Sequence, residues 1–436
     1  MTTHHSDVLI VGAGPAGLSL AISLAQAGFT ATVVEQQSDR ALAAPAPDGR
    51  EIALTHPSRD TLQRLSSWAL LADHEVGTIR EAQVHDGPLG HHGALQLNTQ
   101  GRPAGAAPGA LGFIVPNHAL RRTAYAVAVR TPGVQLITSA QVTRVATLAS
   151  HAELDHVPAS PAGAHSAVGA PPHRLTAPLL VAADSRFSAT RRQLGMGAQM
   201  TDFGRTVIVC RMRHALPHGG VAHECFGYER TLAVLPLPDD PQYGFPLCSV
   251  VVTAGAADAA ALMAQSPDAF AAQVQAQFND QLGAMVLVGD RHAYPLVAVY
   301  AQRFAAHRCA LLGDAAVGMH PVTAHGYNLG LAGVERLTAA LVSARQRGQD
   351  TGSADALAPY AQGHHRHAWP IYQGTNAIVR LYTDARPVPR LLRQLVLQGA
   401  RHLPPLQAAI VGQLTGQAPR WMRVLSPRQA TALHKT

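Results

Sequence analysis

The stretch Asp7-Val-Leu-Ile-Val-Gly12-Ala-Gly14-Pro-Ala-Gly17 lies at the start of the chain and decides the fold class. Its apolar run predicts a buried strand over residues 7–11, and the apolar spacing that follows predicts a helix over residues 15–27, ending at Gly28. Residues 30–35, Thr-Ala-Thr-Val-Val-Glu, predict a second strand. A strand–helix–strand unit with a glycine-rich first turn is typical of an α/β protein with a Rossmann-type, dinucleotide-binding sheet.

The glycines of this turn have separate roles in a dinucleotide site. Gly12 permits the tight turn, Gly14 lets the backbone approach a pyrophosphate, and Gly17 lets the helix pack closely on the strand. The helix opens with Pro15-Ala16, and its positive end would receive the phosphates. Glu35 ends the second strand, where a carboxylate can accept hydrogen bonds from ribose hydroxyls. A chance glycine-rich turn is the alternative, but the strand, the helix and the terminal acid favour the dinucleotide site.

Length and composition exclude several classes of protein. The chain has 436 residues and a mass of 45.8 kDa, which allows two or three domains, and 47% of its residues are hydrophobic, which is enough for a core. Its apolar runs are shorter than the roughly 18 residues of a membrane-spanning helix. Residues 1–7 have no signal-peptide pattern, so we expect a cytoplasmic protein. The cysteines have no CxxC spacing, so we expect buried thiols; they are Cys210, Cys225, Cys248 and Cys309.

The positive charge is concentrated at the end of the chain. Residues 385–436 hold 8 of the 34 Lys and Arg residues and no acid, so the remaining 26 bases and 27 acids nearly cancel. Trp421 is the only aromatic residue of this tail, which argues against a nucleic-acid partner. A basic, leucine-rich tail fits peripheral contact with an anionic membrane surface at the inner face of the membrane. The alternative is a solvated helical face packed on the body of the protein.

The remainder of the chain predicts a second sheet and a helical end. Residues 133–145 and 174–183 predict strands, and the proline-rich residues 150–173 between them predict a hairpin tip or loop. Residues 308–312 predict another buried strand, and the pattern beyond about residue 355 is helical. Proline-rich turns separate further β-type runs, which predict a mostly antiparallel sheet; these are residues 206–210, 232–235 and 249–253.

Two later motifs identify the dinucleotide as FAD. Leu311-Leu-Gly-Asp314 follows a predicted strand and resembles a motif of FAD-dependent aromatic hydroxylases, in which the aspartate holds a ribityl hydroxyl of FAD. The next segment opens a helix near Gly326 and Asn328, whose positive end would face the flavin. Val181-Ala-Ala-Asp184-Ser-Arg-Phe-Ser188-Ala-Thr-Arg191 resembles a second motif, in which the aspartate touches the FAD pyrophosphate. The resemblance implies the class A flavin monooxygenase fold, with an FAD-binding domain, an antiparallel substrate domain and C-terminal helices.

A narrower resemblance covers the same length of chain. Asp48-Gly-Arg50-Glu-Ile-Ala-Leu-Thr-His-Pro-Ser58 resembles the arginine segment of ubiquinone-biosynthesis hydroxylases, in which the arginine lies near the FAD. Tyr294-Pro-Leu fits the same family, and Arg121 lies where relatives have an FAD-contacting helix. The chain departs from most relatives at Ser185, where they have glycine, and at Ala324-His325-Gly326, where they have GQG. It also departs at Val317, where they have the histidine of GDAAH, and at Gly333, where they have aspartate. These departures resemble the subgroup that hydroxylates demethoxyubiquinol at ring carbon 5.

The resemblance implies a monooxygenase that uses FAD, NAD(P)H and O₂ to hydroxylate the ring of a prenylated phenol or quinol through a flavin C4a-hydroperoxide. The cofactor supplies the reactive step in such enzymes, so we expect neither a catalytic triad nor a metal. His320 and His325 flank the expected flavin helix and are candidates for proton transfer or backbone capping. Tyr228, Tyr243 and Phe245 could line the substrate pocket, although core packing is the better prediction. Two alternatives stay open: a flavin hydroxylase of a soluble phenol or polyketide, and a non-catalytic FAD-binding subunit of a biosynthetic complex.

The predicted domains and site residues are as follows. We expect FAD-binding segments at residues 1–72, 111–200 and 301–355, substrate-domain segments at 73–110 and 201–300, and a helical region at 356–436. The expected cofactor-binding residues are Gly12, Gly14, Pro15, Ala16, Gly17, Glu35, Arg50, Arg121, Asp184, Asp314, Gly326 and Asn328.

Overall fold

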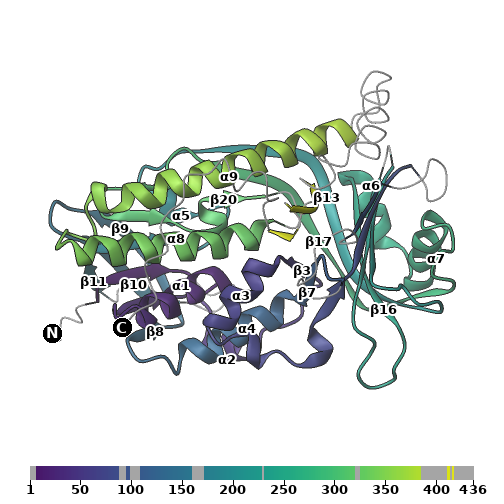
Figure 1. Cartoon of the computed structure of the whole chain (residues 1–436), viewed down its shortest axis with the longest axis horizontal. Coiled ribbons are helices and arrows are strands. Elements are labelled where there is room, and N and C mark those ends of the chain that lie inside the picture. Colours follow the sequence, from purple (N-terminus) through teal and green to yellow (C-terminus); the bar gives the residue numbers. More distant parts are fainter. Residues whose placement is uncertain are drawn as a thin grey trace.

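The structure is a mixed α/β molecule, as predicted. This computed structural model describes residues 6–87, 95–98, 109–159, 171–227, 230–319, 325–383, 410–412 and 415–416. Two large sheets lie at opposite ends of the molecule in Figure 1 and are joined by the long strands β13 (Ala198–His214) and β17 (Met285–Ala301).

The first sheet has the predicted dinucleotide-binding topology. Its order is β18-β19-β12-β1-β2-β8, and its strands are parallel except for β18, which is antiparallel to β19. The strands are β1 (Val8–Val11), β2 (Ala31–Val34), β8 (Val134–Ile137), β12 (Leu179–Ala182), β18 (Ala305–Ala306) and β19 (Cys309–Leu311). The strands β1, β2 and β12 are buried at every position. Helices cover both faces of such a sheet, so its strands have nearly continuous apolar sequences.

Long helices cover this sheet. The predicted first helix is α1 (Pro15–Gln26), which packs against α4 (Asn117–Ala128) and α8 (Gly326–Gln346). The helix α9 (Ala354–Thr383) runs beside α8 along this half of the molecule, as Figure 1 shows. Shorter helices are α2 (Asp39–Ala43), α3 (His56–Arg64) and α5 (Ala189–Gln193), with 3₁₀ turns η1 (Trp68–Leu70), η2 (Asp73–Glu75) and η3 (Gly313–Ala315).

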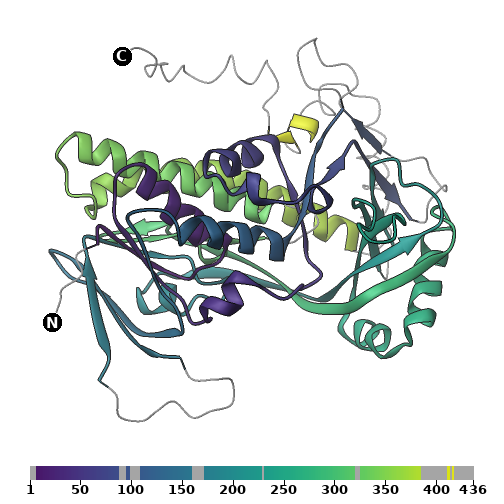
Figure 2. The ribbon, with the colours of Figure 1, turned by 90° about the horizontal axis from the view of Figure 1, so that it is seen from below.

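The second sheet is mostly antiparallel, as expected. Its order is β20-β17-β13-β16-β15-β14-β5-β6, and β14 and β5 form its parallel pair. Besides β13 and β17, its strands are β5 (Glu81–Asp86), β6 (Leu95–Asn98), β14 (Val221–Phe226), β15 (Thr231–Pro236), β16 (Leu247–Gly255) and β20 (Val317–Gly318). Helices α6 (Ala256–Ala264) and α7 (Pro267–Gln277) pack on one face and close an apolar core around Phe270 and Phe278. Figure 2 shows these helices on the outer side of the sheet, far from α1.

Two sequence predictions about strands were wrong in detail. Residues 133–145 are not one strand, because Ser139 has a φ of 49° and turns the chain from β8 into β9 (Ala140–Thr147). Residues 174–183 divide at Pro178 into β11 (His173–Ala177) and β12. The predicted loop at 150–173 contains β10 (Ala152–Pro158), which pairs with β9 and β11 in a three-stranded sheet. The central part of that predicted loop, residues 160–170, lies outside the described residues.

A second small sheet joins the two halves. It has the order β3-β7-β4, with β3 (Glu51–Leu54), β7 (Gly112–Pro116) and β4 (Gly77–Ile79). The two pairings are antiparallel, so β7 lies in the centre. This sheet therefore carries the predicted arginine segment, at the start of β3, between the dinucleotide half and the large sheet.

The described part of the tail packs on the body. Ile410 and Val411 contact Leu95 and Leu97 of β6 and their neighbours on β5. The rest of residues 385–436, including Trp421 and the eight bases, lies outside the described residues. Among the helices that the structure describes, none is both long and apolar enough to cross a bilayer. All four cysteines are buried, as predicted.

Candidate cofactor site and adjoining cavity

The predicted cofactor-binding acids and glycines meet at one edge of the parallel sheet. Gly12 follows β1, Glu35 follows β2, Asp184 follows β12 by one residue, and Asp314 follows β19 within η3. The carboxyl ends of parallel strands lie at a common edge of the sheet. The strand order reverses between β1 and β12, because β2 and β8 lie on one side of β1, and β12 and β19 lie on the other. Ligands of α/β sheets bind at such a switch point.

The three glycines of the first turn have the geometry that their predicted roles require. Gly12 has a φ of +106°, and a Cβ there would lie 2.7 Å from the Ala183 carbonyl oxygen. A Cβ at Gly17 would lie 2.1 Å from the Gly12 oxygen, so the helix can approach the turn only without a side chain. A Cβ at Gly14 would meet no atom within 4 Å. The backbone of Gly14, at the N-cap of α1, is therefore open to a ligand.

Glu35 and Arg121 lie together beside this turn. One Glu35 oxygen accepts a hydrogen bond from the Ala13 N–H at 2.7 Å, and the other accepts one from the Gln37 N–H at 2.9 Å. Arg121, from α4, donates to the side-chain oxygen of Gln37 at 2.7 Å. The structure thus brings a carboxylate and a guanidinium to the end of β2, where the sugar of a dinucleotide would lie.

The segment after β12 holds an acid with unused hydrogen-bonding capacity. Asp184 Oδ2 accepts from the Thr190 N–H at 3.3 Å, whereas Oδ1 is buried and has no hydrogen-bond partner. Arg191 is 3% exposed and donates to the carbonyl oxygens of Arg186 and Ala315, which ties this segment to the one after β19. Burial lowers the pKa of Arg191 despite the nearby Asp184. A buried, unpartnered carboxylate oxygen on a residue that adjoins Gly12 of the glycine-rich turn fits a site completed by a ligand.

Asp314 forms an ion pair that the sequence did not predict. Its Oδ2 lies 3.0 Å from a guanidinium nitrogen of Arg186, which also donates to the Val297 carbonyl oxygen at 3.1 Å. The Asp314 side chain remains 40% exposed, so it can still meet a ligand. The only sequence signal for Arg186 was its position within the second motif, next to Asp184.

The first turn of α8 is hydrogen-bonded to β3 and to the residue that follows it. Asn328 Oδ1 accepts from the Thr55 N–H at 3.0 Å, and its Nδ2 donates to the Ala53 carbonyl oxygen at 2.9 Å. A Cβ at Gly326 would meet no atom within 4 Å, so the first turn of α8 has open space beside it. His325 precedes this turn and is buried, and His320 lies outside the described residues. The Asn328 side chain is thus committed to the protein, which leaves the backbone at the helix start for a cofactor.

Arg50 lies directly before β3 and contacts Asp48 and Tyr294. Its Nε donates to Asp48 Oδ2 at 3.0 Å, and its guanidinium lies 5.5 Å from the ring centroid of Tyr294. Burial alone would raise the pKa of Asp48, but hydrogen bonds from Arg50 and Asn117 hold it below its usual range. The Arg50 side chain is 46% exposed. It is therefore partly free to contact a ligand.

Core packing was predicted for three aromatic residues, and their positions in the structure differ. Phe245 packs against the apolar cluster around Leu247, as expected for a core residue. The prediction of core packing was wrong for Tyr243, which is 69% exposed and stacks on Phe245, because it sits on an exposed turn before β16. Tyr228 lies outside the described residues. The structure shows no cluster of potential metal ligands within its described ranges.

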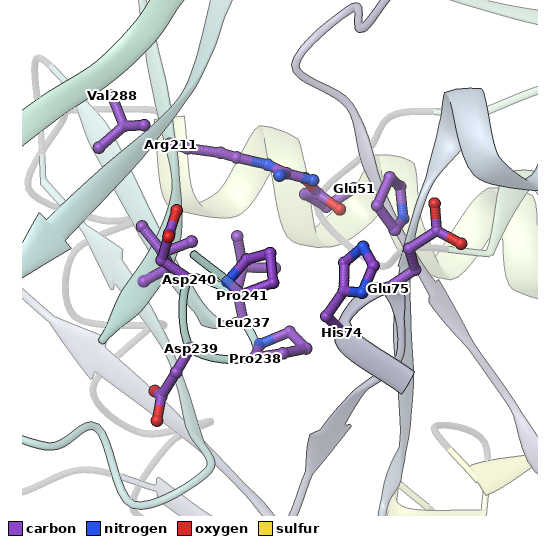
Figure 3. A pocket seen from close by; sticks show the side chains of 12 residues that line it. Glu51, His74, Glu75, Arg211, Leu237, Pro238, Asp239, Asp240, Pro241 and Val288 are labelled. Atoms are coloured by element: carbon purple, nitrogen blue, oxygen red, sulfur yellow. The ribbon is translucent and has the colours of Figure 1, made fainter. Parts of the chain in front are cut away.

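A cavity of about 270 Å³ adjoins β3 on the side of the large sheet. It is lined by Glu51, His74, Glu75, Pro116, Arg211, Leu237, Pro238, Asp239, Asp240, Pro241, Leu247 and Val288. Figure 3 shows Arg211 of β13 reaching toward Glu51 of β3, with His74 and Glu75 on a separate wall. Sequence reasoning missed Glu51 and Arg211, because 160 positions separate them and neither lies in a spacing that signals a pair.

Comparison with known proteins agrees with this geometry. The family described as FAD binding domain matches residues 5–375. The chain is 42% identical over 414 residues to the ubiquinone hydroxylase UbiM of Neisseria meningitidis, covering 94% of this chain and 85% of that protein. It is 33% identical over 427 residues to the ubiquinone hydroxylase UbiL of Rhodospirillum rubrum, covering 96% of this chain and 92% of that protein.

The solved structures show the same fold. The p-nitrophenol 4-monooxygenase PnpA of Pseudomonas putida superposes with a TM-score of 0.72 at 18% identity, covering 95% of this chain and 99% of that one. At this identity the likeness concerns the fold, and it extends over both large sheets and the helices between them.

Proposed function

The chain belongs to the FAD binding domain family and is an FAD-dependent monooxygenase, and from this premise we propose that it hydroxylates the aromatic ring of a prenylated ubiquinone precursor. The observation that carries the proposal is the 42% identity to a ubiquinone hydroxylase over 94% of the chain. We further propose ring carbon 5 of demethoxyubiquinol as the position. The support for that position is the set of departures at Ser185, Val317, residues 324–326 and Gly333.

We propose that the edge of the parallel sheet holds the FAD. The open backbone of Gly14 and the N-terminus of α1 would receive the pyrophosphate. The unpartnered carboxylate oxygen of Asp184 would accept a hydrogen bond from a hydroxyl group of the cofactor. Glu35 would hold the ribose, and the exposed carboxylate of Asp314 would hold the ribityl chain. When bound and reduced by NAD(P)H, FAD activates O₂ for transfer of one oxygen atom to an electron-rich ring. The protein contributes orientation, charge and exclusion of water.

A direct assay tests the substrate. The purified protein, loaded with FAD, is supplied with NAD(P)H, isotopically labelled O₂ and a short-chain prenylated phenol. We expect reductant consumption to increase with the phenol and the product to carry one labelled oxygen atom, detected by mass spectrometry. A parallel reaction with an unprenylated phenol tests the soluble-substrate alternative. Equal reductant consumption with and without the ring, and no labelled product, would reject the substrate assignment.

We also propose that the basic tail brings the enzyme to a membrane. Prenylated quinone precursors partition into the bilayer, so the enzyme has to meet them at its surface. The eight bases and absence of acids over residues 385–436 support attraction to anionic lipid. The contact would be peripheral.

A further inference from the structure

The cavity beside β3 contains a buried acid with an unfilled hydrogen-bonding position. The Glu51 side chain is 2% exposed, and its Oε1 lies 2.8 Å from Arg211 Nε and 2.7 Å from a terminal guanidinium nitrogen of Arg211. Its Oε2 is buried and has no hydrogen-bond partner. An unsatisfied buried carboxylate oxygen is costly in a folded protein. A group that enters the cavity is therefore needed to satisfy it.

Two of the other acids that line the cavity already have partners. Glu75 pairs with Arg122 at 2.7 Å and accepts from the Ala72 N–H at 3.0 Å. Asp240 accepts from two backbone N–H groups of its own turn, at 2.9 and 2.8 Å. Among the paired acids that line this cavity, Glu51 is thus the one with an unused buried oxygen.

The charges that face Glu51 set its protonation. Arg211 on β13 is its ion-pair partner, Asp48 lies just before β3, and His74, Glu75, Asp239 and Asp240 line the remaining walls. Burial is the main influence and raises the pKa of Glu51 to about 7, with a smaller upward contribution from Asp48. Arg211 opposes this rise without cancelling it. A carboxyl group in this state can exchange a proton near neutral pH.

The walls of the cavity suit an aromatic ring. Half of the lining is apolar, namely Pro116, Leu237, Pro238, Pro241, Leu247 and Val288. A volume of about 270 Å³ admits a substituted ring. The strand β3 links the cavity to the turn that is expected to face the flavin, because Asn328 of α8 donates to the carbonyl oxygen of Ala53, two residues beyond Glu51.

We propose that the Glu51 carboxyl group receives the phenolic hydroxyl of the substrate ring and takes its proton during hydroxylation. This inference rests on the proposed function and names the residue that recognises its substrate. In the proton transfer, the phenolic O–H bond breaks and an Oε–H bond forms on Glu51. The electron pair stays on the phenolate oxygen, which raises the electron density of the ring for attack on activated oxygen. Arg211 acts as a positioning residue that fixes the carboxyl group.

The test compares a short-chain prenylated phenol with its methyl ether, which lacks the proton. Binding to the FAD-loaded enzyme is measured from the change in flavin absorption, and hydroxylation of the phenol is measured from pH 5.5 to 8.5. We expect the wild type to bind the phenol about tenfold or more tightly than the ether, as for a hydrogen bond to a charged group. We expect hydroxylation to fall as the pH falls through about 7, because protonated Glu51 cannot accept a proton.

The variant Glu51→Gln keeps the size of the side chain and removes the base. It should retain FAD, lose most of the preference for the phenol, hydroxylate about 100-fold more slowly or worse, and lose the decline of activity near pH 7. The matched control is Glu335→Gln. It removes the carboxylate of Glu335 on α8, which pairs with Arg64 of α3 and does not line the cavity. This control should keep the wild-type preference and pH profile.

Each outcome decides between the claims. Equal affinity of the wild type for phenol and ether overturns the inference, even if Glu51→Gln does not fold. If Glu51→Gln forms product at an unchanged rate and with an unchanged pH profile, the inference about Glu51 is overturned and the proposed function stands. A wild type that prefers the phenol but yields no oxygenated product overturns the proposed function, and the proton transfer with it.

Discussion

Single residues at the edge of the parallel sheet form the proposed cofactor site, and Gly14 gives its most direct test. Its backbone faces open space, whereas Gly12 and Gly17 are needed for the turn itself. A side chain at Gly14 would fit the protein but occupy the space of the pyrophosphate. We therefore expect Gly14→Val to fold and to lose FAD, measured by flavin absorbance after gel filtration. A purified Gly14→Val protein with normal FAD affinity would contradict the N-terminal assignment.

Asp314 provides a second test at this scale. Its exposed carboxylate would accept a hydrogen bond from the ribityl chain, and a hydrogen bond to a charged group is worth about 1.5–3 kcal/mol. We expect Asp314→Ala to fold and to bind FAD more weakly by this amount, measured by titrating FAD into the apoprotein. The control is Asp60→Ala, which removes the exposed pair with Arg59 and should leave the FAD affinity unchanged. Unchanged affinity in Asp314→Ala would place the ribityl contact elsewhere.

Sequence reasoning identified residues well where a local pattern carried the information. The glycine-rich turn and Glu35 were found because strand, turn and helix follow one another within 30 residues. The pairing of Glu51 with Arg211 could not be predicted from the sequence, since that contact depends on how β3 packs against β13. Arg186 was visible only as part of a motif, and its contact with Asp314 required the structure.

Helices and strands were also predicted well where a local apolar pattern marks them. The first strand, helix and second strand were predicted to within a residue or two, because their apolar runs are buried on both faces. The turn at Ser139 was missed because a single residue with positive φ leaves no trace in an apolar pattern. The strand β10 was missed because proline and glycine residues after it made the whole stretch look like a loop.

The junction between β3 and α8 can be tested as an element contact. Asn328 satisfies the Thr55 N–H and the Ala53 carbonyl oxygen, so Asn328→Ala leaves both without this partner. We expect the free energy of unfolding in urea to fall by about 1–3 kcal/mol. Gln349→Ala, which changes an exposed amide after the same helix, is the control and should have no measurable effect. Equal unfolding midpoints for the two variants would show that the junction is held by other contacts.

At the scale of the whole molecule, the sequence predicted two sheets but not their connection. The parallel pair β14–β5 joins segments about 140 residues apart, and the long strands β13 and β17 run between the two halves. Contacts of this kind depend on the complete fold. They also create the cavity, whose walls come from β3, η2, β7, β13, β16 and β17 together with the loop after β15.

The basic tail gives the last prediction, which concerns how the whole molecule meets its substrate. If three or four of its bases reach an anionic leaflet, each contributes about 1 kcal/mol, which gives weak and salt-reversible binding. The competing view, in which the apolar residues of the tail pack on the body, holds for Ile410 and Val411, which contact β6. Membrane attraction, as proposed, would come from the charge of the arginines rather than from insertion of apolar residues.

Liposome co-sedimentation separates the two views. We expect binding to vesicles that contain anionic lipid, with loss of binding by roughly 0.5 M salt. Changing Arg390, Arg393 and Arg401 to Gln should weaken it. The matched control changes Arg130, Arg303 and Arg347 to Gln, which removes the same charge from exposed positions elsewhere and should preserve binding. Equal binding to neutral vesicles, or none at low salt, would reject the electrostatic tail, because neither result follows from attraction between arginines and an anionic surface.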